Sequence, residues 1–407
     1  MKNLSRWVLV ALVAVLFAAQ MQGAKADPLD HWTTNQVLYA NPLYPTFYFG
    51  MDQVVYGNGI YVAYGEEGDS GDFFTSPDGY NWKFQYSEAN SWGLPSLGYA
   101  NGHYFGCAEG GFGPVHVSAD GTNWTSVGIP GYVTQNGFPA MAYGNGLYVL
   151  AGDTNGVASI FTSPDGVTWT SQKINVAPGG PIQSVAYGSS KFVAVGANDG
   201  FEYTSGIGTW TRRSIPGGSQ ITFCGNLFFV PFTSNSNLLS NDGINWTMAH
   251  TGLTNQLGNI IYSHGIYLAA SGLYLASSAD GTNWYQYPQP IPDYPYYEST
   301  PPPHWGSIAT DGYHVLKVAW QTADYSPASF VYISDGLVGM RFTNNAPQKL
   351  VVSGLIGRNY QIQSMDSLGS MSNWRTNATF QLSNTPSVWT DSTATNSMRF
   401  YRTVLLP

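Results

Sequence analysis

Short runs of alternating apolar and polar or small residues, each bounded by turn residues, recur along most of this chain. Met141–Ala151 holds two such runs around Gly144-Asn145-Gly146, and Ser159–Ile174 holds two more around Pro164-Asp165-Gly166. A period of two predicts half-buried strands, and Asn-Gly and Asp-Gly supply the positive φ angles of tight hairpins. This stretch therefore predicts a unit of four antiparallel strands.

The third turn of this unit belongs to a phrase that returns along the chain, first as Ser76-Pro77-Asp78-Gly79-Tyr80-Asn81-Trp82. The closing tryptophans, and one at the end of a decayed copy, follow each other at intervals of 36 to 45 residues. Self-similarity at this period is typical of one propeller blade of four strands. Further copies run over Ser118–Trp124, Ser163–Trp169, Ser240–Trp246 and Ser277–Trp284, and the decayed copy ends at Trp210. Units begin near Asp52, Ser96, Ala140, Ser184, Ile221, Ile260 and Ile308.

The last unit lacks its outer strand. It has the turn Ser334-Asp335-Gly336 but no strand led by tryptophan after it, whereas Asp30–Asn35 near the N-terminus has the missing pattern. An N-terminal strand that completes the last sheet would close the ring and remove an open sheet edge. The prediction is an all-β fold, a seven-bladed β-propeller closed by its N-terminal strand.

Residues 1–26 form a separate segment typical of a secretory signal peptide. Lys2 and Arg6 precede the apolar run Val8–Ala19, and Ala24-Lys25-Ala26 suits cleavage. The run is too short to predict a membrane span. We therefore expect an exported protein that is secreted, periplasmic or bound to the cell surface, with the propeller over 27–336.

The phase changes after Gly336, and residues 337–407 read as short strands without the repeated phrase. A small antiparallel β-sandwich is the predicted C-terminal module. It resembles short C-terminal modules that end in a Phe-Tyr-Arg phrase, here Arg399–Arg402, on secreted bacterial repeat proteins.

Charge is divided unevenly between the predicted domains. Residues 27–336 carry 22 acidic and 6 basic side chains, whereas 337–407 carry 2 and 6. An acidic propeller repels phosphate backbones, so nucleic acid is excluded as a partner and neutral carbohydrate or a cell-surface protein is favoured. Cys107 and Cys224 fall in different units, too far apart for a predicted disulfide.

The repeated phrase resembles the Asp-box of sialidase-like propellers of the BNR type, and the resemblance covers about residues 30–336. It implies that the boxes lie on the face away from a ligand site, so their aspartates are expected to be structural. This chain departs from the family spacing, because Asp78 and Gly79 are adjacent where the family has an intervening residue. A sialidase also needs three converging arginines, and the propeller holds only Arg212 and Arg213. Sialidase activity is therefore not expected.

The opposite face carries the loops after the second and fourth strands of each unit, where ligands tend to bind. Candidate carboxylates on this face are Glu66, Asp72, Glu109, Asp153 and Glu202. No cofactor is predicted, and the oxygen-rich stretch Glu66–Asp72 is the one candidate for Ca²⁺, although it lacks EF-hand spacing. Aromatic residues in the connections between units are candidate ligand contacts: Tyr44, Tyr48, Trp92, Tyr294, Tyr296, Tyr297 and Trp305.

Flat aromatic faces and carboxylates together suit the C–H groups and hydroxyls of sugars. The favoured function is a non-catalytic module that recognises extracellular carbohydrate. Two alternatives stay open at this point. One is a glycoside hydrolase or polysaccharide lyase that uses a carboxylate pair about 5–10 Å apart on the same face. The other is a surface scaffold for a protein partner.

Overall fold

The computed structural model describes residues 29, 32–37, 50–67, 70–89, 96–107, 115–129, 141–154, 157–173, 182–196, 200–204, 210–213, 218, 220–263, 265–271, 274–287, 304–312, 314–321, 328–334, 338–343, 346–354, 359–365, 374–383, 387–392 and 400–405. The chain divides into two compact units. One is Trp32–Ile333, and the other combines Met1–His31 with Ser334–Pro407. No helix within the described ranges is long and apolar enough to cross a membrane.

The first unit contains six four-stranded antiparallel sheets whose strands are consecutive in the sequence. In each of them the order of the strands in the sheet is the same as their order in the sequence. The first three contain β2 (Gly50–Gly57), β3 (Ile60–Glu67), β4 (Ser70–Ser76) and β5 (Lys83–Ala89); β6 (Ser96–Ala100), β7 (His103–Cys107), β8 (Val115–Ser118) and β9 (Thr125–Val127); and β10 (Met141–Gly144), β11 (Leu147–Thr154), β12 (Val157–Ser163) and β13 (Thr170–Lys173). The next three contain β14 (Ile182–Gly188), β15 (Lys191–Gly196), β16 (Gly200–Thr204) and β17 (Trp210–Arg213); β18 (Thr222–Cys224), β19 (Leu227–Thr233), β20 (Ser236–Ser240) and β21 (Thr247–His250); and β22 (Ile260–Ser263), β23 (Ile266–Ser271), β24 (Tyr274–Ser278) and β25 (Trp284–Gln286).

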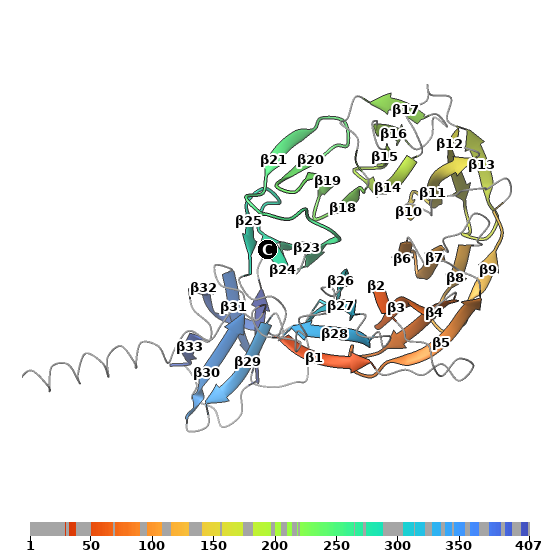
Figure 1. Cartoon of the computed structure of the whole chain (residues 1–407). Coiled ribbons are helices and arrows are strands. Elements are labelled where there is room, and N and C mark those ends of the chain that lie inside the picture. Colours follow the sequence, from red (N-terminus) through yellow and green to blue (C-terminus); the bar gives the residue numbers. More distant parts are fainter. Residues whose placement is uncertain are drawn as a thin grey trace, which may run out of the picture. The chain divides into compact units, whose positions relative to one another are not determined.

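A further four-stranded sheet, here called the closing sheet, joins the two ends of this unit. Its order is β1-β28-β27-β26. β1 (Trp32–Val37) is therefore an edge strand that pairs with β28 (Ala328–Ser334), followed by β27 (Val315–Gln321) and then by β26 (His304–Thr310) at the other edge. The strand order confirms that the N-terminal segment completes the last sheet. The predicted all-β propeller is also confirmed, as a ring whose first strands lie nearest its centre (Figure 1).

Hydrophobic clusters between neighbouring sheets hold the ring together. The cluster around Val54 and Phe74 also contains Leu316 and Val331 of the closing sheet. Five more clusters join each consecutive sheet to the next, from β2–β5 to β22–β25. A hydrogen bond joins the closing sheet to the segment just before β22: Asn259 Oδ1 accepts from Ile308 N–H at 3.0 Å. The sheets from β2–β5 to β18–β21 therefore each pack both faces against neighbours. In the next sheet, β23 has all six residues buried.

Polar side chains add a second kind of contact between first strands. Gln53 Oε1 accepts from Leu97 N–H of the next sheet at 2.6 Å. In the closing sheet, Ser307 Oγ accepts from Val54 N–H at 2.7 Å. These side chains satisfy backbone groups of the neighbouring sheet, which would otherwise be unpaired.

The second unit contains two three-stranded antiparallel sheets. One has the order β29-β30-β33, and the other has the order β32-β31-β34. Leu350, Val352 and Trp389 of the first share a cluster with Ile362 and Phe380 of the second. The strands are β29 (Val338–Thr343), β30 (Ala346–Gly354), β31 (Asn359–Met365), β32 (Arg375–Gln381), β33 (Ser387–Thr390) and β34 (Phe400–Leu405).

Candidate functional site at the loop-side ends of the strands

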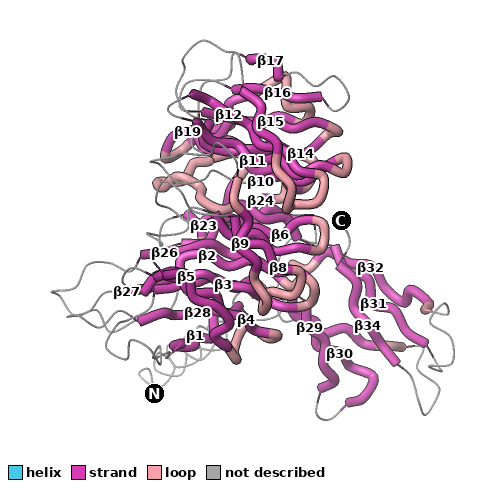
Figure 2. Tube along the Cα trace, turned by 90° about the vertical axis from the view of Figure 1, so that its right-hand side faces the viewer, coloured by secondary structure: helices cyan, strands magenta, loops and turns pink. Residues whose placement is uncertain are grey.

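The propeller unit has two different faces. The turn face carries the tight turns between the first and second strands and between the third and fourth strands of each sheet. The loop face carries the connections between the second and third strands and between sheets. Most of the described turns gather along one side of the ring (Figure 2). The two faces differ in how their polar groups are bonded.

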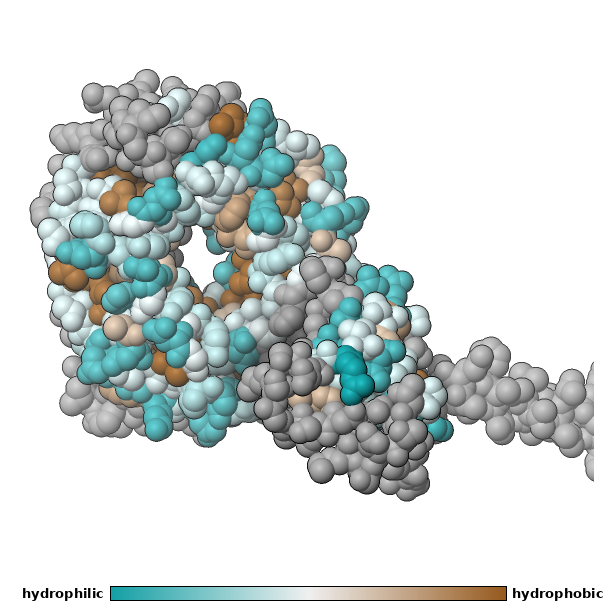
Figure 3. Space-filling model, turned by 180° about the vertical axis from the view of Figure 1, so that it is seen from behind, coloured by the Kyte–Doolittle hydropathy of each residue, from teal (hydrophilic) through white to brown (hydrophobic). Residues whose placement is uncertain are grey.

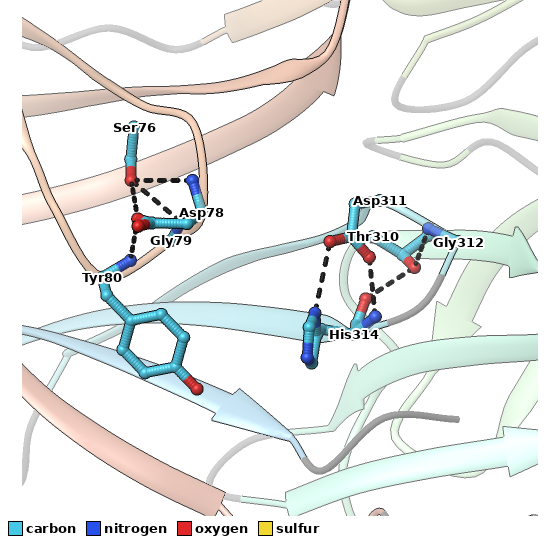
Figure 4. Close-up of polar contacts among 8 residues, drawn as sticks. All are labelled: Ser76, Asp78, Gly79, Tyr80, Thr310, Asp311, Gly312 and His314. Atoms are coloured by element: carbon cyan, nitrogen blue, oxygen red, sulfur yellow. Dashed lines mark hydrogen bonds and ion pairs between the residues drawn. The ribbon is translucent and has the colours of Figure 1, made fainter. Parts of the chain in front are cut away.

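On the turn face, the repeated phrase satisfies its own polar groups. Ser76 Oγ accepts from Gly79 N–H at 2.9 Å and donates to Asp78 Oδ1 at 3.0 Å. The same carboxylate oxygen accepts from Tyr80 N–H at 2.8 Å (Figure 4) and from Asn81 N–H, also at 2.8 Å. Trp82 Nε1 donates to Gly79 O at 2.7 Å, which holds the indole ring against the turn. The aspartate therefore organises a turn, as an Asx-type residue does.

Four other copies repeat this bonding pattern, with the serine–glycine contact at 2.8 to 2.9 Å in each. Their aspartates are Asp120, Asp165, Asp242 and Asp280. In the last copy the serine that makes these contacts is Ser278, so the copy starts one residue later than Ser277, as aligned from sequence. The geometry supports the structural reading of all five aspartates.

These hydrogen bonds lower the pKa of the aspartates. Burial raises the pKa of Asp78, but the bonds from Asn81, Tyr80 and Ser76 outweigh it and lower the pKa to about 2. The pKa of Asp165 is also lowered, mainly by hydrogen bonds from the N–H groups of Thr168 and Val167. A carboxylate that accepts several backbone N–H bonds is expected to behave in this way.

We expect the propeller to lose stability as the pH falls from about 4 to about 2. An unfolded aspartate titrates near pH 3.9, so below that pH the unfolded chain binds more protons than the native one. The contribution is complete above about pH 5 and is lost as the pH approaches the folded pKa of Asp78, about 2. Melting temperatures by circular dichroism from pH 2 to 7 would show it. In Asp120→Asn, whose amide cannot ionise, this acid dependence should be weaker, and an unchanged slope would contradict the assignment.

The first turn of the closing sheet has a different chemistry. In the first three sheets Asn58, Asn101 and Asn145 take a positive φ there, and in the fourth Ser189 and Ser190 do so. In the closing sheet His314 N–H donates to Asp311 Oδ1 at 2.6 Å, and the imidazole Nδ1 lies 3.3 Å from Oδ2 (Figure 4). Thr310 Oγ1 donates to His314 O at 2.7 Å. In this turn too, the polar groups on the turn face bond to one another.

Three predicted carboxylate positions are placed by backbone register. Glu66 pairs with Gly50 and Gly71, close to the loop-side end of β3. Asp153 pairs with Ala158 close to the loop-side end of β11. Glu202 pairs with Val193 in β16. These sheets bring Glu66 and Asp153 to the same face of the ring.

Asp72 differs from the other candidates because its side chain is 0 % exposed. It pairs with Gly65 and Ser87, and it lies on the side of β4 that also carries Phe74. Phe74 packs against the closing sheet, so Asp72 points into the interior between these sheets. A ligand on the surface would not touch it in this conformation.

The predicted aromatic contacts fall almost wholly outside the described residues. Trp305 belongs to β26, where it pairs with Ala319. Glu109, Tyr44, Tyr48, Trp92, Tyr294, Tyr296 and Tyr297 lie outside the described ranges. Within those ranges, no three His, Cys, Asp or Glu side chains are grouped so that they could hold a metal ion. The roles of these residues stay predictions.

Lys317 has no role predicted from the sequence, and the fold buries it completely in β27. It pairs with Ile308 and Tyr332 inside the closing sheet. Desolvation lowers the pKa of its amine to about 7. The lysine lies among apolar neighbours in the sequence Val315–Trp320, and this was the signal that the sequence offered.

No family model matches this chain, and no curated protein matches it. Among solved structures, it resembles the extracellular domain of the putative one-component system BT4673 from B. thetaiotaomicron, with a TM-score of 0.50, 13% identity, and coverage of 86% of this chain and 47% of that one. The WD40 domain of Neurospora crassa Pan2 gives a TM-score of 0.50 at 8% identity, covering 75% and 96%. PorZ, a surface component of the type-IX secretion system of Porphyromonas gingivalis, gives 0.48 at 11% identity, covering 86% and 46%.

The two similarities with a TM-score of 0.50 support the propeller fold and nothing finer. The chain spans about half the length of the BT4673 and PorZ structures that it matches.

Proposed function

We propose that this protein is an exported binding module that recognises extracellular carbohydrate through the loop face of its propeller. The observation that carries the proposal is a difference between the two faces in how their polar groups are used. On the turn face, serine, aspartate and tryptophan groups bond to one another within each turn. Glu66 and Asp153 lie at strand ends on the loop face, in two sheets that are separated by a third. This position supports the proposal that the hydrogen-bonding groups for a ligand belong to the loop face.

Carbohydrate is the ligand class that best fits the predicted composition of this face. Carboxylates accept hydroxyl hydrogen bonds, and the aromatic residues predicted in the connecting loops would stack on sugar rings. The formal charge of −9 disfavours polyanionic ligands. A rigid ring carrying variable loops is a common scaffold for such recognition.

We expect a purified chain to bind members of a neutral glycan array and a double variant, Glu66→Gln with Asp153→Asn, to lose at least about 10-fold in affinity, about 1.4 kcal/mol. Asp165→Asn is the matched control, because it neutralises a carboxylate on the turn face. Absence of glycan binding by the intact chain, or equal binding by the double variant, would count against the proposal. New reducing ends released from a bound polysaccharide would instead indicate a hydrolase.

For the second unit we infer a small β-sandwich. Both three-stranded sheets contribute to the cluster around Leu350 and Ile362. Sharing one core between two sheets is the ordinary way for short antiparallel sheets to bury their apolar faces.

A further inference from the structure

Asn237 departs from the pattern that the third strands of the other sheets follow. It lies three residues before Ser240, the serine that begins the repeated phrase in its sheet. At this position five other sheets have a buried apolar residue that is at most 2 % exposed. These residues are Phe73, Val115, Ile160, Leu275 and Val331. The sheet β18–β21 therefore has an amide where its neighbours have part of their core.

The amide of Asn237 is buried without a hydrogen-bond partner. The side chain is 1 % exposed, and neither Nδ2 nor Oδ1 forms a hydrogen bond with any described residue. On the adjacent strands it lies opposite Pro231 and Ala249, which have no polar side chain. An unpaired buried amide costs free energy that an apolar residue at the same place would not. Such a residue in a repeated core position indicates a role other than packing.

The connection from β21 to β22, residues 251–259, covers the side of the sheet to which Asn237 points, and we call it the strap. Leu253 and Leu257 of the strap belong to the same hydrophobic cluster as Ala249. Ala249 lies directly opposite Asn237, so the two side chains face the same way. The strap joins two sheets and therefore belongs to the loop face. Its leucines keep water from the amide.

The strap is anchored near both ends. Thr251 N–H donates to Asn235 O at 2.8 Å, and Gly258 N–H donates to Ala270 O at 2.7 Å. Gly252, beside the first anchor, is exposed and has a φ of 72°, a conformation that glycine enters and leaves without steric cost. Opening would expose the two leucines but would release the amide, so the two effects oppose each other. The open state is then a minor state that a ligand for the amide would favour.

Polar side chains next to the central opening of the ring are used differently. A space-filling view from behind shows this opening (Figure 3), and the first strands lie nearest to it (Figure 1). There Gln53, Asn259 and Ser307 each accept a hydrogen bond from a backbone N–H of another sheet. These groups therefore hold the ring together, whereas the hydrogen-bonding capacity of Asn237 is unused by the described part of the chain.

We propose that the strap opens to admit a neutral sugar, whose neighbouring hydroxyl groups bond to the amide of Asn237. An amide has a donor and an acceptor side by side, which suits a pair of hydroxyl groups. Phe232 is bulged out beside Pro231 and is 38 % exposed, so it offers a ring for stacking at the loop-side end of the same sheet. The sugar as ligand rests on the proposed function, whereas the opening of the strap does not.

Hydrogen exchange of the full chain, measured by mass spectrometry, tests the opening. Asn237→Leu should slow exchange across the strap at least about 5-fold, because leucine fills the site without an unpaired amide and is itself unfavourable to expose. The melting temperature should rise by about 2 °C or more. Asn241→Leu is the matched control, because Asn241 is an exposed asparagine on the turn face of the same sheet, and neither quantity should change. Equal strap exchange in Asn237→Leu and the intact chain, or a lower melting temperature in that variant, would overturn the proposal.

Affinity for the neutral glycan that the intact chain binds best tests the ligand. Asn237→Leu should weaken this binding at least about 10-fold, and Asn241→Leu should leave it unchanged. Equal binding by Asn237→Leu would overturn this inference and leave the proposed function in place. If the intact chain binds no glycan, the proposed function and the sugar ligand are both wrong, and the exchange result alone decides whether the strap opens.

Discussion

Deleting residues 32–37 is expected to lower the melting temperature of the propeller by about 10 °C. The deletion removes β1, so β28 loses its hydrogen-bonded neighbour. It also removes Val37 from the cluster between β2–β5 and the closing sheet, and the 2.6 Å bond from Asn35 Nδ2 to Tyr80 O. Lost ladder bonds at about 1 kcal/mol each, with the apolar contact, sum to about 5 kcal/mol.

Circular dichroism of the deleted and intact chains checks this result. Thr33→Ala is the control, because Thr33 is exposed and its loss should leave the melting temperature within about 1 °C. A synthetic peptide of residues 30–38, added in excess, should restore part of the lost stability. Without it, the bare edge of β28 should promote association of the deleted chain, visible as light scattering. An unchanged melting temperature would show that β1 does not support the ring.

The closure of the ring by the N-terminal strand could be predicted from the sequence, because the last unit visibly lacks its fourth strand. Every other complete unit ends with a tryptophan-led strand, and the unit that reaches Ser334 has none. A matching segment, Trp32–Val37, was available at the other end of the chain. The bonding of the repeated phrase was equally readable, because all its contacts lie within seven residues.

Contacts between sheets could not be predicted in the same way. Tyr187 Oη donates to Asn145 Oδ1 at 2.7 Å across 42 residues, and nothing local in the sequence pairs these two positions. The repeated dipeptides Tyr143-Gly144 and Tyr187-Gly188 were a visible signal, but their meaning depends on the angle between neighbouring sheets. The burial of Asp72 has the same origin, because the closing sheet covers it from the far end of the chain.

Candidate ligand residues were the hardest to place from sequence. Tyr294 and its neighbours sit in connections that do not repeat, so no internal copy fixes their position. Periodicity predicts the strands on either side of such a loop and says nothing about the loop's path. By contrast, Glu66 and Asp153 are at strand ends, where register alone assigns a face.

Gly144→Ala is expected to destabilise the protein by about 2–3 kcal/mol, because the junction between two sheets has no room for a methyl group. A Cβ at Gly144 would lie 2.2 Å from the Tyr187 ring of the next sheet. Gly57 and Gly188 meet Tyr99 and Phe223 in the same way, at 2.2 to 2.4 Å. Urea unfolding measures the loss. In a Tyr187→Ala background the same substitution should cost less than about 0.5 kcal/mol, because the obstructing ring is gone.

Gly98→Ala separates this packing effect from the general effect of replacing a strand glycine. Gly98 also lies in a first strand, β6, but a Cβ there meets nothing within 4 Å, and its φ is not positive. Alanine should therefore be neutral, or stabilising by a few tenths of a kcal/mol through the unfolded chain. Equal losses for Gly144→Ala and Gly98→Ala would mean that the ring tolerates an extra methyl beneath Tyr187. The tyrosine–glycine contact would then not set the spacing between sheets, and the hydrophobic clusters alone would set it.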